Sequence, residues 1–264
     1  MRDVNVNSVR AIDRAIDLLN VFSVEHPVLT IDEIVAKTKL PKTTAYRILY
    51  TLELRGLIQY DQKNQNYRLG LKLLEYAGTL TTLLDVRQEA EEILINLQTN
   101  TKQTVIMAVI EQETFVYVFL RENPVGFKYS SYIGLRRPIN FGVLGQVIMA
   151  HLTEDELERL LQKHPLVRMT SKTVTDLDVL RVRFKKIKEE RVYADMEETY
   201  EGGIAIGAPI YDAEGKLIAA LAILGPAVQL DGDRLEPAKL MVKEAASQIS
   251  LKMGFKEALG GVRL

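Results

Sequence analysis

The stretch of sequence that decides the fold is residues 30–47, TIDEIVAKTKLPKTTAYR. Thr30 and Glu33 form the pattern of a capping box, in which a hydroxyl and a carboxylate each bind a free backbone N–H at the start of a helix. A short turn at residues 39–40 follows, and Pro41 suits the first turn of a second helix, where its missing N–H costs nothing. The stretch therefore predicts two short helices joined by a tight turn.

The second helix of this hairpin has two distinct faces. Apolar residues recur at steps of three and four and should face a core; they are Ala45, Ile48, Leu49 and Leu52. Lys42 and Arg47 lie on another face, and no acidic residue interrupts the segment between Glu33 and Glu53. A helix N-terminus also attracts phosphate. This pattern predicts either a DNA-reading helix-turn-helix or, as the alternative, a basic solvated hairpin in an ordinary domain.

The expected DNA contacts are of two kinds, to base edges and to phosphates, according to the chemistry of the side chains. A threonine can touch a thymine methyl and an arginine can pair with guanine. The residues expected at base edges are Thr43, Thr44 and Arg47. The residues expected on phosphates are Lys42 and Arg10. For Tyr46 we expect packing beneath the helix together with a phosphate contact.

The segments on either side complete a winged helix. Ser8 is the expected N-cap of a preceding helix, whose apolar stripe consists of Val9, Ile12, Ile16, Leu19 and Phe22. Residues 57–61 and 67–69 predict two strands around a polar turn at residues 62–66. Lys63 and Arg68 of this wing suit backbone phosphates, which position a protein on DNA without specifying its sequence.

Residues 8–78 resemble the N-terminal domain of the IclR family of bacterial transcriptional regulators. Four motifs carry the resemblance: SVRAIDRA at 8–15, LPKTTAYR at 40–47, LELRGLI at 52–58 and YRLG at 67–70. The resemblance implies a DNA-binding domain, for which we set the bounds 1–70.

Composition limits the remaining possibilities. The 264 residues carry a formal net charge of −1, so DNA binding has to rest on a local basic surface. The absence of cysteine excludes disulfides, cysteine-based zinc sites and thiol catalysis. The N-terminus has no apolar core of a signal peptide, and the longest apolar run is too short to span a bilayer. We therefore expect a cytoplasmic protein without membrane contact.

Residues 71–99 are expected to connect two domains. Gly78 and residues 79–82 mark a break, and an amphipathic helix follows over 82–99. This helix can cap its own C-terminal domain or pack against a partner copy. The resemblance favours a linker helix that contributes to dimerisation.

Residues 100–264 are expected to form the second domain. The predicted strands are residues 104–110, 114–121, 127–132, 203–211 and 216–224. The predicted helices are residues 141–151, 154–162, 176–190 and 233–255. Strands with helices packed on one face make an α+β domain. The fold class is thus α+β with two domains, a winged helix-turn-helix and a second domain of mixed strands and helices.

The second half also resembles the IclR family, through GLRRP at 134–138 followed by Gly145, DMEE at 195–198 followed by Gly202, and two strand motifs, API at 208–210 and LGP at 224–226. The resemblance implies a GAF-like effector-binding domain, a small-molecule effector, operator DNA as partner, and a homodimer or tetramer. Effector contacts are expected at Phe141, Gly142, Val143, Leu144, Asp195, Glu197, Ala205, Ala222 and Leu224.

Three of these positions depart from the family pattern. Family members often place a cysteine and serines where this chain has Ala205, Ala222 and Leu224. Apolar side chains cannot replace the hydrogen bonds that a small buried carboxylate needs. We therefore expect a larger or more apolar effector than glyoxylate, or a polar one held from the acidic segment.

Chemistry by the chain itself has little support in the sequence. None of the three histidines stands in a recognised spacing with a nucleophile, and hydrolase, zinc-protease and phosphate-loop motifs are absent. Asp195, Glu197, Glu198 and Glu201 are acidic, but no histidine lies near them, so we expect neither a metal nor a cofactor. We predict a ligand-responsive DNA-binding regulator of a metabolic operon, in the role of a repressor. The alternatives are an enzyme with an attached DNA-binding domain and an architectural DNA binder without an effector.

Overall fold

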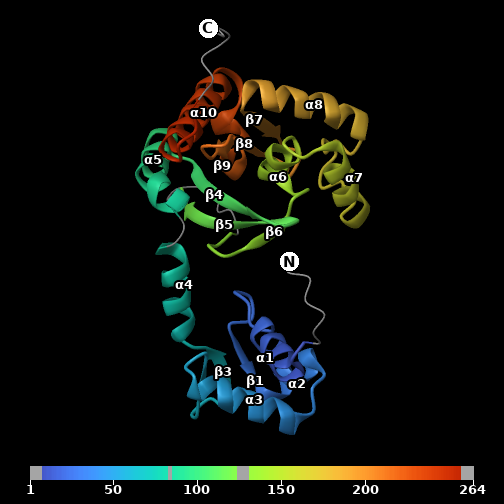
Figure 1. Ribbon diagram of the computed structural model, residues 1–264, viewed down its shortest axis with the longest axis vertical. Coiled ribbons are helices and arrows are strands. Elements are labelled where there is room, and N and C mark those ends of the chain that lie inside the picture. Colours follow the sequence, from blue (N-terminus) through green and yellow to red (C-terminus); the bar gives the residue numbers. More distant parts are fainter. Residues whose placement is uncertain (1–7, 83–84, 124–130, 257–264) are drawn as a thin grey trace. The chain divides into compact units, whose positions relative to one another are not determined.

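The computed structural model describes residues 8–82, 85–123 and 131–256 (Figure 1). It divides into two compact units, Met1–Leu83 and Leu84–Leu264. Each unit is an independent domain with its own core, and each is described by itself below.

The first domain holds a helix-turn-helix and a three-stranded antiparallel sheet of order β1-β3-β2. Its elements are α1 Arg10–Asn20, β1 Val28–Thr30, α2 Ile31–Thr38, α3 Lys42–Leu54, β2 Ile58–Asp61, β3 Asn66–Leu69 and α4 Lys72–Thr82. Leu18, Ile34 and Leu49 come from three different helices and are fully buried together with Ile58 of the wing. This core holds the helix-turn-helix against the wing.

The capping box predicted for α2 is present. The Thr30 hydroxyl accepts from the Glu33 backbone N–H at 3.4 Å, and the Glu33 carboxylate accepts from the Thr30 N–H at 2.7 Å. Lys39 ends the helix in the left-handed conformation, and Pro41 precedes α3 rather than standing in its first turn. Strand β1 was not predicted. Its last residue is the same Thr30, which pairs with Asn66 of the wing.

Two expectations for α1 are corrected. Ser8 does not cap the helix, because its hydroxyl donates to the Asp13 carboxylate instead. The expected apolar stripe is also divided between two environments. Leu19 and Phe22 pack into the core, whereas Val9, Ile12 and Ile16 are 61%, 60% and 50% exposed. The reason is that Leu18, on a different side of the helix, is the residue that α1 buries completely.

The expected break at Gly78 is also wrong. Helix α4 runs without interruption through this residue to Thr82. A glycine costs a helix only about 1 kcal/mol relative to alanine, which neighbouring helix-forming residues can offset. Helix α5 begins at Asp85, and residues 83–84 lie outside the described residues.

The second domain is a six-stranded antiparallel sheet of order β6-β5-β4-β9-β8-β7. Its elements are α5 Asp85–Thr101, β4 Thr104–Glu111, β5 Thr114–Arg121, β6 Arg136–Pro138, α6 Gly142–Met149, α7 Glu154–Lys163, α8 Leu177–Glu190, β7 Tyr193–Met196, β8 Gly203–Tyr211, β9 Leu217–Pro226, α9 Ala227–Leu230, a 3₁₀ turn Gly232–Arg234 and α10 Leu235–Lys252. The two short edge strands, β6 and β7, were not predicted. The predicted strand at 127–132 lies mostly outside the described residues, and positions 131 and 132 are not in a strand.

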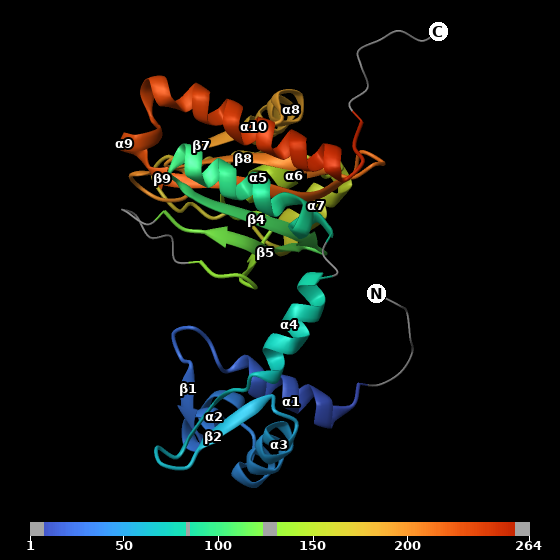
Figure 2. The same ribbon diagram turned by 90° about the vertical axis from the view of Figure 1, so that its left-hand side faces the viewer.

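Helices cover both faces of this sheet, not one as expected. Helices α5 and α10 lie on one face and α6, α7 and α8 on the other (Figures 1 and 2). Alternate strand residues therefore enter different cores: Ile106 faces α6, whereas Met107 faces α5. A bulge in β5 inserts Val118, so that Val118 and the next residue, Phe119, both enter the α5 core.

Helix α5 uses its apolar stripe within its own domain. Val86, Ala90, Leu94 and Leu97 are all buried in the core that α5 shares with α10. Of the two roles considered for this helix, the structure shows the capping of its own sheet. Its apolar face is therefore not free to pair with another copy.

Candidate nucleic-acid interface and ligand pocket

Helix α3 presents a continuous outer face. Thr43, Tyr46 and Arg47 are exposed, while Thr44 is half-buried. The apolar residues predicted to face the core do so: Ala45 and Leu49 are fully buried. Tyr46 is 47% exposed, so it does not pack beneath the helix. The helix therefore offers one polar and aromatic surface along its length.

Two residues of this outer face were not predicted. Tyr50 is 63% exposed, and Leu54 is 68% exposed one turn further on. Tyr50 follows Tyr46 by four residues, and Leu54 follows Tyr50 by four. The spacing that identified the buried face could therefore also have identified these two residues. The exposed face thus continues to the C-terminal end of α3.

Lys42 does not stand free at the start of α3. Its ammonium group forms an ion pair with the Asp32 carboxylate of α2, at 2.5 Å. The hydrogen bond to Asp32 raises the pKa of Lys42. Both groups are on the surface, where such a pair is weak. Lys42 is therefore able to exchange Asp32 for a phosphate at small cost.

The wing has an ordered turn. Asp61 accepts hydrogen bonds from the backbone N–H groups of Lys63 and Asn64, at 2.9 and 3.2 Å. These bonds and that from the Asn64 amide lower the pKa of Asp61. Arg68 of β3 donates to the Gln59 side chain of β2 at 3.1 Å. The predicted phosphate contacts Lys63 and Arg68 are thus exposed on a well-defined hairpin.

Helix α3 packs against both neighbouring sites of expected phosphate contact. It contacts α1, which begins with the exposed Arg10, and it contacts strand β2 of the wing. The wing hairpin lies beside α3 in Figures 1 and 2. Helix, wing and α1 thus form one unit of the first domain.

The second domain contains a small cavity beneath α6. The space between its walls is about 280 Å³, which includes open solvent. Six of the nine predicted effector contacts line it: Phe141, Gly142, Val143, Leu144, Ala205 and Leu224. Five further lining residues were not predicted: Ile106, Phe115, Tyr117, Thr199 and Tyr200. The unpredicted residues come from β4, β5 and the segment after β7, which only the folded sheet brings to α6.

The three other predicted contacts have different surroundings. Asp195 lines an adjoining cavity, which shares Thr199, Tyr200, Ala205 and Leu224 with the first. Ala222 is fully buried in the same core but lines neither cavity. Glu197 also lines neither, because its carboxylate is held by Lys172 at 2.8 Å and by the Gly202 backbone N–H. The expectation of a ligand contact at Glu197 is therefore not supported by its position.

The cavity is built where α6 approaches the sheet closely. Gly145 lies against the Ile139 carbonyl, and a Cβ at this position would come within 2.3 Å of that oxygen. Gly142 opens the helix with φ = 62°, a conformation that glycine adopts without strain. Glycine at these two positions brings the start of α6 to the cavity wall.

The acidic segment after β7 has a structural role in this domain. Asp195 is 3% exposed and accepts from the Thr199 hydroxyl and from the backbone N–H of Glu198, at 2.7 Å. Burial raises the pKa of Asp195 in spite of these bonds. Glu198 pairs with Arg183 of α8 at 2.9 Å and accepts from the Tyr193 hydroxyl. The segment therefore fixes one wall of the cavity to α8.

Within the described ranges 8–82, 85–123 and 131–256, no three acidic or histidine side chains gather closely enough to hold a metal ion. None of the described helices is long and apolar enough to cross a membrane.

Comparison with known proteins shows to which family the chain belongs. The model of the IclR helix-turn-helix domain matches residues 11–62, and that of the bacterial transcriptional regulator IclR C-terminal domain matches residues 78–251. The chain belongs to the IclR family. It is therefore a transcriptional regulator of the helix-turn-helix type, with the two-domain fold of that family.

Individual IclR relatives align along almost their whole length. The HTH-type transcriptional regulator XynR of Escherichia coli K12 is 28% identical over 247 residues, which are 94% of this chain and 98% of XynR. The HTH-type transcriptional repressor AllR of Salmonella typhi is 26% identical, over 94% of this chain and 91% of AllR. An IclR homologue from Microbacterium hydrocarbonoxydans, solved with 4-hydroxybenzoate, is 25% identical with a TM-score of 0.82, over 92% of this chain and 98% of the homologue.

Proposed function

We propose that this IclR-family chain is a repressor of a metabolic operon, which reads its operator with the exposed face of α3 and responds to a small molecule bound beneath α6. The observation that carries the proposal is the outer face of α3, where Thr43, Tyr46 and Arg47 are exposed on the second helix of a helix-turn-helix. In such motifs the second helix enters the major groove and its N-terminal residues contact base edges. A relative named as a repressor supports the direction of regulation.

The cavity supports an effector with an apolar body. Its walls include Phe115, Phe141 and Leu224, and ligand sites of this kind are mostly apolar with a few polar groups. Little of the space between these walls is free, so the cavity favours a compact compound. An IclR homologue of the same fold was solved with 4-hydroxybenzoate, a compact compound with one ring. The domain binds such a ligand without converting it, since Asp195 is the one carboxylate of the two cavity linings and is already engaged by Thr199.

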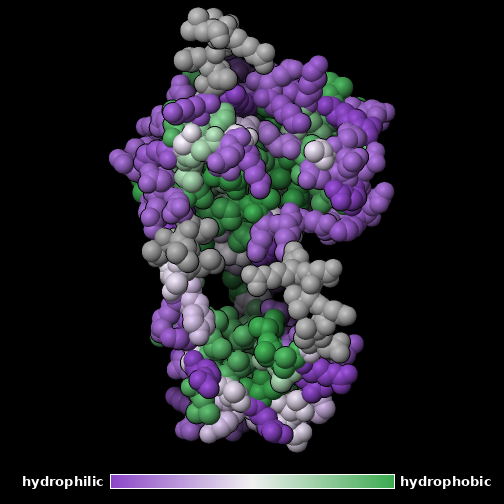
Figure 3. Space-filling view, in the orientation of Figure 1, coloured by the Kyte–Doolittle hydropathy of each residue, from purple (hydrophilic) through white to green (hydrophobic). Residues whose placement is uncertain are grey.

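We also propose that the chain acts as a homodimer through α1. Val9, Ile12 and Ile16 form an exposed apolar stripe on this helix, and Figure 3 shows apolar surface over this part of the first domain. The stripe is flanked by the repeat RAIDRAID at 10–17. In an antiparallel pair of copies, Arg10 would meet Asp17, and Asp13 would meet Arg14. Burial of an apolar stripe between opposite charges favours such a pair.

The contrast between two single variants tests DNA reading. Arg47→Ala should cost about 1–3 kcal/mol on the operator and relax sequence discrimination, because a base contact is lost. Lys63→Ala should weaken binding to all sequences equally and reduce the salt dependence by about one counterion. Fluorescence anisotropy on the operator and on a shuffled duplex, at several salt concentrations, separates the two effects. Equal discrimination by Arg47→Ala and the unchanged chain would contradict the proposed reading face.

A further inference from the structure

Arg137 is a charged residue on the cavity side of the sheet. In the β5–β6 pair its Cα lies opposite that of Phe115. Residues directly opposite each other in an antiparallel pair point to the same face of the sheet. Phe115 is fully buried in the core beneath α6 and lines the cavity. Arg137 therefore projects to the α6 side of the sheet. It does not itself line the cavity, but its guanidinium carbon lies 4.6 Å from the centre of the Phe141 ring, which does.

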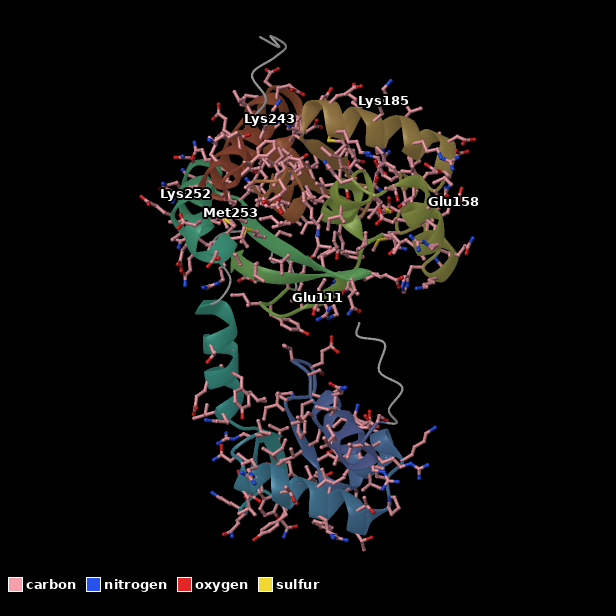
Figure 4. The ribbon with its side chains drawn as sticks, in the orientation of Figure 1. Glu111, Glu158, Lys185, Lys243, Lys252 and Met253 are labelled. Carbon is pink, nitrogen blue, oxygen red and sulfur yellow. The ribbon has the colours of Figure 1, made fainter. Side chains whose placement is uncertain are left out.

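The charge of Arg137 has no counter-charge in the described part of the chain. Its Nε is buried and has no hydrogen-bond partner among the described residues. The neighbouring Arg136 differs in the direction of its side chain and in its partners. It points to the other face, pairs with Glu111 at 2.5 Å and donates to the Thr114 hydroxyl at 2.7 Å. Figure 4 labels Glu111 at the end of the sheet beside β6.

Arg137 is partly exposed, but its Nε is buried, and a buried N–H without a partner is costly. An anion that accepts a hydrogen bond from this N–H would remove that cost. Stacking on Phe141 orients the planar guanidinium group without neutralising it. An arginine in this state is suited to a carboxylate, which it can bind through two parallel hydrogen bonds. Phe141 connects Arg137 with the cavity, because its ring stacks on the guanidinium group and also lines the cavity.

We propose that Arg137 is the specificity-determining residue for an anionic effector, and that it binds the carboxylate of a ligand whose apolar ring fills the cavity. The inference rests on the proposed function, because it assigns the class of compound that this cavity takes. It also assigns the direction of binding. Asp195 lines only the adjoining cavity, which Phe141 does not line, so the carboxylate points to Arg137 and the uncharged end of the ligand to Asp195.

The test compares acids with their uncharged amides on the full chain. The probes are benzoate, phenylacetate and 4-hydroxybenzoate, together with benzamide, phenylacetamide and 4-hydroxybenzamide. Binding is measured as the shift in Tm and as Kd by calorimetry. The variants are Arg137→Met and the matched control Arg136→Met, which removes the adjacent arginine of the same strand. Arg137→Lys serves as a second variant that keeps the charge, should Arg137→Met fail to fold.

We expect at least one acid to bind the unchanged chain at least tenfold more tightly than its amide. Arg137→Met should weaken the binding of that acid at least tenfold, Arg137→Lys should weaken it less, and Arg136→Met should leave it unchanged. Acid binding that survives Arg137→Met overturns the role of Arg137. Amides that bind as well as acids also overturn it, but leave the cavity as the effector site. If neither series binds, the proposed effector site fails together with this inference.

Discussion

Among single residues, the two basic side chains Lys42 and Arg47 of α3 have different surroundings. Lys42 is held by Asp32 of the preceding helix, whereas Arg47 lies exposed one turn further along α3. Sequence spacing predicted that both residues would be on the surface. It could not predict the ion pair, because Asp32 is ten positions away and meets Lys42 only when α2 and α3 cross. The same limit applies to Arg137, whose surroundings depend on pairing with β5.

The surroundings of His151 lead us to expect that the stability of the second domain depends on pH. The Nδ1 of His151 lies 2.8 Å from the Val147 carbonyl, and its Nε2 lies 2.6 Å from the Tyr211 hydroxyl. A carbonyl only accepts, so Nδ1 carries the proton, and in the neutral ring Nε2 accepts from Tyr211. Burial lowers the pKa of His151, and the nearby Lys188 and Arg191 lower it further.

The sign of the effect follows from the lowered pKa of His151. As pH falls below about 6.5, the unfolded chain binds a proton at this position before the folded chain does, so the free energy of unfolding decreases. Denaturant titrations at pH 7.5 and pH 5.5 measure this loss. In His151→Gln the loss between the two pH values should be smaller than in the unchanged chain. An equal loss in both proteins would contradict the role assigned to His151.

At the scale of elements, local signals predicted most of the helices and the long strands. The capping box placed α2, and the Asp212–Gly215 turn placed β8 and β9. The short strands β1, β6 and β7 were missed, because no tight turn joins them to the strands with which they pair. The equally short β2 and β3 were predicted, because the polar turn at residues 62–66 joins them. The cavity was predicted in part for a similar reason. Phe141–Leu144 could be named from the loop motif, but Phe115 and Tyr117 reach α6 only through the fold of the sheet.

The exposed stripe of α1 gives a prediction for this element. Ile16→Glu places a charge in the proposed apolar contact, so it should raise the dissociation constant of the homodimer at least tenfold. Val182→Glu is the matched control, since Val182 is 73% exposed on α8, away from that contact. Light scattering with size-exclusion chromatography compares each mass with the 29.8 kDa of one chain. A dimer unchanged by Ile16→Glu would exclude the α1 stripe as the interface.

At the scale of the whole molecule, the chain joins two domains with separate tasks. The first exposes a helix suited to DNA, and the second encloses a cavity suited to a small ligand. Regulation requires that the ligand bind two states of the protein with different affinity. The family relationship could be predicted from motifs spread over both halves of the sequence. The effector could not be named, because the side chains that line the cavity come from β4, β5 and α6, which only the fold brings together.

We propose that this chain recognises a palindromic operator as a dimer. DNase footprinting of the full chain on the DNA that flanks its own gene tests this proposal. We expect one preferentially protected site with two inverted half-sites, whose centres lie about 34–36 Å or a multiple of that distance apart. Adding a compound found to bind the second domain should change the protein concentration needed for protection. Protection that spreads without sequence preference, or a single half-site without an inverted partner, would show that the proposal is wrong.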